Sequence, residues 1–212
     1  MTLDVIHADA AIVVLNKPPG LLSVPGRGAD KQDCLHTRMQ SQYPDALVVH
    51  RLDMATSGLI IFARNKSVQR TLGDAFAARE VHKRYEAVVS GRVCAAQDDW
   101  QVIDLPIVVD WPNRPLRIID PVHGRPSVTR MRCLGHNPLD NTSRVALEPV
   151  TGRSHQLRVH MQAIRHCILG DALYATAEVL AQSPRLLLHA SQLALRHPLS
   201  GTLLEFNCPA GF

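Results

Sequence analysis

Hydrophobic and polar side chains alternate over residues 127–134 and 144–150, and this period of two predicts half-buried β-strands. Continuous apolar runs at residues 11–15 and 59–62 predict strands buried on both faces. Further strands are predicted at residues 84–90, 186–195 and 202–206. Strands therefore outnumber helices along this chain.

The helical period is confined to three places. Residues 33–42 predict a short helix. Apolar residues at helical spacing predict a second helix, capped by Asn65 or Ser67, and a third that runs from a Ser154 cap to residue 164. The inward-facing residues are expected to be Val68, Leu72, Ala75 and Phe76 in the second helix and Leu157, Met161 and Ile164 in the third.

Together these elements predict an α+β fold, in which a mixed but mainly antiparallel sheet is flanked by helices and loops. Five prolines between residues 106 and 126 interrupt the chain and predict short strands and loops there. The sequence contains no internal repeat and no linker rich in Ser or Gly. We therefore expect one domain over residues 1–212.

Composition excludes several classes of protein. The chain has 212 residues, of which 46% are hydrophobic and 20% charged, so it is not disordered, collagenous or a coiled coil. The longest apolar runs are about six residues, far short of the roughly 20 that a bilayer requires. The first 15 residues contain no basic region typical of a signal peptide. We therefore expect a cytoplasmic protein without membrane association.

The cysteines argue against a disulfide framework. Their number is odd, no Cys-x-x-Cys pair occurs, and they are widely spaced: Cys34, Cys94, Cys133, Cys167 and Cys208. We expect reduced thiols in a reducing compartment. No Cys or His motif predicts a metal site, although a zinc site assembled from distant residues stays an alternative.

Positive charge is concentrated in the middle of the chain. Nineteen of the 23 basic residues are arginine, and residues 112–165 hold nine Arg against two Asp and one Glu. Arginine is suited to bidentate phosphate contacts and to stacking on bases. This pattern favours a polyanion such as RNA as the partner, and a solvated arginine-rich surface is the alternative.

The densest group of reactive side chains lies at residues 50–58, His-Arg-Leu-Asp-Met-Ala-Thr-Ser-Gly. Asp53 lies there between His50, Arg51 and the hydroxyl of Thr56, directly before an apolar strand. Such a carboxylate can serve as a nucleophile, a general base or a metal ligand. The alternative is a capped turn in which Asp53 and Arg51 form a structural ion pair.

A second polar group covers residues 151–160. Gly152 is expected to open a helix whose free N–H groups attract anions, with Arg153 in the first turn and Arg158 one turn further on, close to His155 and Gln156. The alternative is an amphipathic helix with an ordinary polar face. The sequence contains neither a nucleophile elbow nor a P-loop, and the loop around Arg27 lacks the third glycine of a dinucleotide fingerprint.

The order of these motifs resembles the RluA-type pseudouridine synthases over nearly the whole chain. The family's nucleophile motif matches residues 50–58, its basic residue before a strand tyrosine matches 83–85, and its G-R-x-H-Q-[IL]-R motif matches 152–158. Shorter landmarks match residues 16–20, 169–171 and 187–190. One departure is Cys167, where many relatives have proline before the 168–171 turn.

Two further segments, residues 23–27 and 110–115, resemble the namesake branch of this family. That branch modifies both 23S ribosomal RNA and a tRNA anticodon stem-loop. The resemblance also implies that the chain lacks the N-terminal S4-type RNA-binding domain of several relatives, because its first strand begins by about residue 10.

The resemblance implies a role for each matching residue. Asp53 would be the catalytic carboxylate, Arg158 the bidentate partner that keeps it ionised, and Tyr85 the ring that stacks on the target base. Arg51 would fill the space left when that base leaves the RNA. The residues expected to bind RNA are His50, Arg51, Thr56, Arg153, His155, Gln156, Arg27 and Arg114. The reaction needs no metal or other cofactor, and we expect a monomer without an obligate protein partner.

Two other classes of function stay open. The chain can be an RNA-binding protein that remodels loops, with catalysis incidental to that act. It can also be a hydrolase that cleaves a nucleoside bond with the same Asp53.

Overall fold

The computed structural model describes residues 3–93 and 99–212; Cys94 lies outside them. Contacts divide the chain into two compact units, each described separately below. The first unit comprises Met1–Lys83 and His189–Gly211, and the second comprises Arg84–Leu188 and Phe212. The single catalytic domain expected over residues 1–212 stays a prediction.

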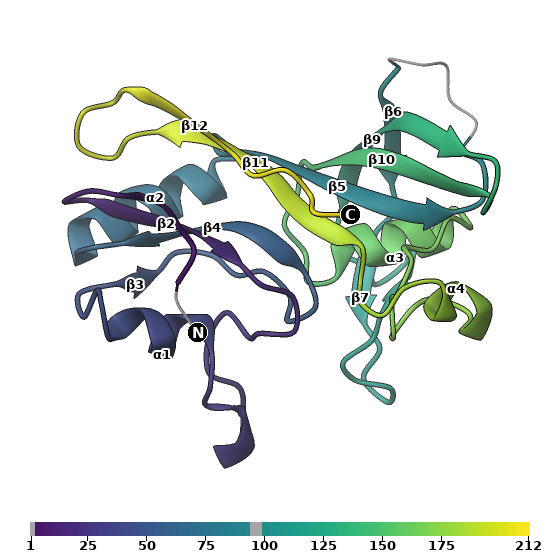
Figure 1. The fold of residues 1–212 in the computed structure, drawn as a ribbon, viewed down its shortest axis with the longest axis horizontal. Helices are drawn as coiled ribbons and strands as arrows, with labels where there is room; N and C mark the ends of the chain where they lie inside the picture. The colour runs from purple at the N-terminus through teal and green to yellow at the C-terminus, as the bar shows by residue number, and fades with distance from the viewer. Residues whose placement is uncertain (1–2, 94–98) are drawn as a thin grey trace. The chain divides into compact units, whose positions relative to one another are not determined.

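The first unit contains a mostly antiparallel sheet with the order β1-β2-β4-β11, in which β4 and β11 run parallel (Figure 1). β12 extends the sheet by pairing with β11, and the short β3 pairs with β4. The strands are β1 (Val5–Ala8), β2 (Ile12–Lys17), β3 (Leu47–Val48), β4 (Ser57–Ala63), β11 (Leu188–Arg196) and β12 (Leu203–Asn207). A 3-10 turn, η1 (Ala29–Lys31), and two helices, α1 (Leu35–Gln40) and α2 (Lys66–Ala77), complete this unit.

The core of the first unit forms between the sheet and α2. Val68 and Leu72 of α2 pack with buried β2, β4 and β11 side chains such as Ile61 and Leu193. The Asn65 side chain accepts a hydrogen bond from the Val68 N–H at 2.9 Å, so Asn65 is the cap of α2. The predicted apolar face of this helix is confirmed.

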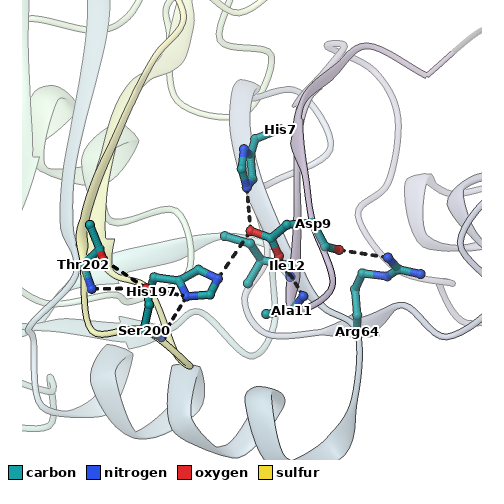
Figure 2. A network of polar contacts seen from close by, with 8 residues as sticks. All are labelled: His7, Asp9, Ala11, Ile12, Arg64, His197, Ser200 and Thr202. Carbon is teal, nitrogen blue, oxygen red and sulfur yellow. Dashed lines mark hydrogen bonds and ion pairs between the residues drawn. The ribbon is translucent and has the colours of Figure 1, made fainter.

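A polar network joins the β1–β2 turn to the β11–β12 hairpin within the first unit (Figure 2). The Asp9 carboxylate lies 2.7 Å from His7 Nε2 and 3.3 Å from His197 Nε2, and it accepts the N–H of Ile12. Arg64 donates to the main-chain carbonyl of Asp9 at 2.8 Å. The Asp9–Ile12 bond closes the β1–β2 turn and His197 joins it to the other hairpin, so the network is structural.

The second unit contains an antiparallel sheet with the order β5-β10-β9-β6 and a separate β7–β8 hairpin. Its strands are β5 (His82–Ser90, whose first two residues belong to the first unit), β6 (Gln101–Asp104), β7 (Ile107–Val109), β8 (Arg117–Ile119), β9 (Val128–Asn137) and β10 (Thr142–Pro149). Two helices, α3 (Gln156–Ala163) and α4 (Ala177–Ala181), belong to this unit. Figure 1 shows α3 along one face of the sheet, where it packs against β8, β9 and β10.

Most of the predicted elements are confirmed, and so is the mainly antiparallel α+β class. The start of the third helix was predicted wrongly. α3 begins at Gln156 after His155, which has a left-handed backbone (φ 59°) and no side-chain cap. Ser154 therefore caps nothing, and Arg153 precedes the helix instead of lying in its first turn. The sequence did not predict β1, β3, β6 and α4, because they are short and carry no clear period.

Two absences hold for the described parts of the chain. No helix there is long and apolar enough to cross a membrane. Residues 3–93 and 99–212 also contain no group of three or more His, Cys, Asp or Glu side chains that could hold a metal ion.

Candidate active-site residues

The Asp53 loop of the first unit is held by main-chain hydrogen bonds. The Ser23 hydroxyl donates to the Leu52 carbonyl at 2.7 Å and accepts the Leu52 N–H at 3.1 Å. Directly after it, the Thr56 N–H donates to the carbonyl of Asp53 at 3.1 Å, which closes a turn around the half-buried carboxylate. The backbone of Asp53 is therefore fixed on both sides.

Gly58 ends this motif for a steric reason. Its φ is +110°, and a Cβ at this position would lie 2.4 Å from the carbonyl oxygen of Ala190. β4 and β11 run parallel at this point, with Gly58 paired to Ala190. Only glycine combines this φ with this approach of the two backbones. Residues 50–58 thus join a polar turn to a strand that is buried from its first residue.

Lys17 at the end of β2 is a fully buried cation near Asp53, and the sequence alone did not reveal it. Its Nζ donates to three carbonyls, those of Pro18 (2.9 Å), Leu21 (2.8 Å) and Met54 (3.1 Å). Burial lowers its pKa to about 8, and the negative charge of Asp53 opposes this shift. The ammonium of Lys17 therefore lies within electrostatic range of the Asp53 carboxylate.

His50 connects the loop to β4 as a neutral side chain. Its Nε2 accepts the Ile61 N–H at 3.1 Å, and its ring stacks on Phe76 with centroids 4.6 Å apart. Burial and the neighbouring charge of Lys83 lower the pKa of His50 to about 3. His50 therefore carries no positive charge at pH 7 and positions the loop, and its contact with RNA stays a prediction.

Other predicted residues of the first unit differ in exposure. Thr56 is buried at the start of β4, whereas Arg51 and Arg27 are exposed. Among the described residues Arg51 makes no hydrogen bond or ion pair, so the alternative of a structural Arg51–Asp53 ion pair is wrong. Exposure leaves both arginines able to contact RNA.

In the second unit Arg158 is buried on α3 and paired with Asp171. Its Nε and Nη2 donate to the two carboxylate oxygens at 2.8 and 2.5 Å. The guanidinium also lies over the ring of Tyr174, 5.1 Å from its centroid. Asp171 belongs to the 169–171 landmark, but no local pattern indicates that its partner is Arg158, 13 residues earlier. The sequence analysis missed this pair.

Gln156, two residues before Arg158, is tied to β9 and to the loop before α3. Gln156 is buried: its amide donates to the Val128 carbonyl and to the Thr129 hydroxyl, and its oxygen accepts from Thr151 and from the Arg153 N–H. These four bonds make Gln156 a positioning residue for the start of α3. Its predicted contact with RNA is not supported by its burial.

His155 and Arg153 remain accessible beside it. His155 is half-buried, and its Nδ1 lies 2.7 Å from the Tyr174 hydroxyl. Arg153 is exposed, and its Nε donates to the carbonyl of Pro126 at 3.4 Å. This bond directs the arginine toward the segment after the β7–β8 hairpin and leaves its other nitrogens available for a phosphate.

Tyr85 lies on β5 opposite Leu147 of β10 and is half-buried. Arg114 is exposed at the tip of the β7–β8 hairpin. Cys167, where many relatives have proline, accepts the Ser90 N–H at its carbonyl (2.9 Å), and its thiol donates to the carbonyl of Tyr174 at 3.4 Å. The predicted residues are thus divided between the units: Arg27, His50, Arg51, Asp53 and Thr56 in the first, and Tyr85, Arg114, Arg153, His155, Gln156 and Arg158 in the second.

Comparison with known proteins identifies the family. Residues 11–163 match the family described as RNA pseudouridylate synthase. A dual-specificity RNA pseudouridine synthase RluA from Escherichia coli O6:H1 is 49% identical over 210 residues, which cover 99% of this chain and 94% of that protein. Its counterpart from Yersinia pestis is 48% identical over 208 residues, which cover 98% of this chain and 99% of that protein. The chain belongs to the RNA pseudouridylate synthase family, and the predicted resemblance is confirmed.

Solved structures support the same assignment. Human RNA pseudouridylate synthase domain containing 1 has a TM-score of 0.79 and 28% identity, covering 98% of this chain and 83% of that one. Human RNA pseudouridylate synthase domain containing 4 has a TM-score of 0.74 and 25% identity, with 98% and 88% covered. The predicted pseudouridine synthase fold is therefore confirmed.

Proposed function

We propose that this protein isomerises specific uridines to pseudouridine in structured RNA loops, in 23S ribosomal RNA and in a tRNA anticodon stem-loop. The observation that carries this proposal is near-full-length similarity to relatives named as dual-specificity enzymes, together with the complete Asp53 motif. The exposed arginines Arg27, Arg51, Arg114 and Arg153 supply the positive charge that an RNA partner requires.

The reaction rearranges bonds within one nucleotide. The bond from ribose C1′ to N1 of uracil breaks, a bond from C1′ to C5 forms, the C5 proton leaves and N1 gains a proton. The product is an isomer, so no redox cofactor or energy source is consumed. Asp53 is the proposed catalytic carboxylate, by attack on ribose or by formation of a glycal. Tyr85 stacks on the base and accepts the C5 proton.

The base must leave the RNA stack before this reaction, because stacking hides the glycosidic carbon; unstacking costs a few kcal/mol and least in a loop. Arg51 is the residue proposed to occupy the vacated space, which agrees with its exposure and its lack of intramolecular bonds among the described residues. Arg158 is proposed to support the ionised Asp53. Its immobilisation by Asp171 gives the guanidinium a defined direction.

The proposal extends to the cellular setting. Ribosomal and transfer RNA are the proposed substrates, so we expect the protein to act in the cytoplasm. We also expect a monomer that needs no obligate protein partner.

The test follows tritium release from C5 of uridine in two unmodified transcripts, an anticodon stem-loop and a hairpin of 23S ribosomal RNA. The Asp53→Asn variant is expected to lose release by at least about 1,000-fold while it still binds RNA, because only the carboxylate changes. The matched control is Asp74→Asn, which alters an exposed carboxylate on α2 of the same unit. Full turnover in Asp53→Asn disproves the mechanism.

The products separate the alternatives. Free uracil among them favours the nucleoside-bond hydrolase, since an isomerase releases no base. An Asp53→Asn variant that restores every defect of a deletion strain favours the RNA-remodelling protein.

Arg153 tests the mode of binding. Replacing Arg153 with Gln is expected to weaken binding of both RNAs and to reduce the slope of log K against log salt by about 1, as for one lost phosphate contact. Arg70→Gln, which replaces an exposed arginine on α2, is the control for a general loss of positive charge. Equal effects of the two substitutions contradict a specific phosphate contact at Arg153.

A further inference from the structure

Trp111 is exposed at the tip of the β7–β8 hairpin. Aromatic residues make up only 4% of the chain, and all nine lie in the described parts. Eight of them are buried or half-buried, whereas Trp111 is 64% exposed. A large indole in water contributes little to the core and is available to a partner outside the chain, and tryptophan is enriched at such interfaces.

The indole does not stand alone at this tip. The Arg114 guanidinium lies over it at 4.7 Å from the ring centroid, and Arg114 Nε donates to the Trp111 carbonyl at 3.1 Å. Asp110 accepts both the backbone N–H (3.3 Å) and the side-chain amide (3.0 Å) of Asn113. The turn is thus fixed by its own hydrogen bonds, and its exposed tip combines an aromatic ring with a cation that lies over that ring.

The base of the hairpin is anchored on α3 within the second unit. Ile107 of β7 packs with Val159 of α3 and with Tyr174. The Tyr174 hydroxyl accepts the Arg117 N–H at 3.0 Å and lies 2.7 Å from His155 Nδ1. The Tyr174 side chain therefore connects β8 to the start of the helix that carries Arg158.

Two further arginines lie at the base of the hairpin, where Arg125 pairs with Ile107. Arg125 and Arg153 are exposed, and Arg153 Nε donates to Pro126 next to Arg125. Two carboxylates belong to the same region and keep their charge: Asp110 binds Asn113, and Asp120 accepts the N–H groups of the two residues that follow Pro121. Exposed arginine beside an exposed indole matches RNA, which offers phosphates and unpaired bases in the same loop.

We propose that Trp111 and Arg114 form a stacking platform for one unpaired base of the substrate RNA, separate from the uridine that is modified. This inference rests on the proposed function for the identity of the RNA. The indole binds the face of the base, and the guanidinium binds the adjoining phosphate or a neighbouring base. Because the hairpin is anchored on α3, the platform is held in place before RNA arrives, and its effect falls on binding.

The test uses the fact that the chain has two tryptophans. In a Trp100→Phe variant Trp111 is the sole tryptophan, and titration with the unmodified anticodon stem-loop transcript is expected to quench its fluorescence. In the wild-type background Trp111→Ala is expected to raise the Kd and KM for this transcript by roughly 5- to 150-fold, as for loss of one base stack, with kcat at saturation unchanged. Trp111→Phe retains an aromatic face and is expected to recover most of the affinity.

Leu139→Ala is the matched control, because Leu139 is 95% exposed on the β9–β10 turn and is not part of the platform. The midpoint of urea unfolding should be unchanged in Trp111→Ala, since an exposed side chain is removed. Unquenched Trp111 fluorescence at saturating RNA, or wild-type KM in Trp111→Ala, overturns the platform.

These results are distinguishable from failure of the proposed function. Pseudouridine formed at the same rate by wild type and Trp111→Ala, with the transcript below the wild-type KM, overturns the platform and leaves the function intact. Quenching and weakened binding without any pseudouridine support the platform as an RNA-binding surface and overturn the proposed activity.

Discussion

Two buried cations, one in each unit, are stabilised in opposite ways. Lys17 in the first unit is surrounded by three backbone carbonyls. Arg158 in the second unit is paired with the carboxylate of Asp171. Both side chains are almost completely buried, at 0% and 4% exposure. The difference lies in whether the bound partner carries a charge.

Carbonyl dipoles satisfy the hydrogen bonds of an ammonium without cancelling its charge. The charge of Lys17 therefore still acts on its surroundings, which include Asp53. A guanidinium cannot give up its proton in a protein, so a buried arginine needs a counter-charge. The comparison teaches that Lys17 is suited to an electrostatic influence on a carboxylate, whereas Asp171 primarily fixes the position of Arg158.

The largest effect is expected from breaking the Arg158–Asp171 pair. Asp171→Asn keeps the shape and removes the charge, and it should lower the free energy of unfolding by about 3–5 kcal/mol, because Arg158 is left buried without this counter-charge. Urea unfolding measures the loss. The double variant Asp171→Asn/Arg158→Met should recover part of it. A double variant that is no more stable than the single one contradicts this reason.

The next effect concerns Lys17 and appears as a pH dependence. Its pKa is about 8 in the folded chain and 10.5 in the unfolded one, so between these values only the unfolded chain holds the proton. By linkage Lys17 makes the free energy of unfolding rise with pH across this window, by about 3 kcal/mol at most. Below about pH 8 this contribution is constant.

Lys17→Met removes the titrating group and should flatten that rise relative to wild type. Unfolding by urea at pH 7, 8, 9 and 10 checks the difference between the two proteins. Lys66→Met is the control, because it removes an exposed lysine from α2 of the same unit. Identical pH slopes for wild type and Lys17→Met contradict the buried ammonium.

The smallest effect is expected at a partly exposed charge, the Asp9 carboxylate of Figure 2, which is 32% exposed. Burial raises its pKa, but hydrogen bonds from His7, Ile12 and Ala11 outweigh this and lower the pKa to about 2. The resulting stability is present above the unfolded value of 3.8 and is lost as the pH falls through about 2.

Asp9→Asn should therefore cost about 1 kcal/mol at pH 6, since solvent screens this site more than the two buried cations. The cost should shrink as the pH falls from 4 toward 2. Urea unfolding of both proteins at pH 6, 4 and 3 measures it. If Asp9→Asn lowers the free energy of unfolding as much as Asp171→Asn does, the expectation that an exposed charge contributes less than a buried one is wrong.

Local patterns were sufficient for most of the fold. Alternation predicted β9 and β10, the helical period and Asn65 predicted α2, and the motif at 50–58 identified Asp53 as the candidate carboxylate. They failed at the start of α3. There the buried side chain of Gln156 accepts a hydrogen bond from the Arg153 N–H. His155 has a left-handed backbone and forms no side-chain cap.

The sequence by itself determined the family, the order of the strands along the chain and the residue types of the candidate site, because these depend on composition, period and short motifs. Only the tertiary structure decided that Lys17 is buried, that Asp171 is the partner of Arg158 and that Gln156 is enclosed. The physical reason is separation along the chain. Lys17 binds the carbonyl of Met54, 37 residues away in the sequence, and Gln156 binds that of Val128, 28 residues away. Burial and hydrogen bonds between residues so far apart in the sequence form only after the chain has folded.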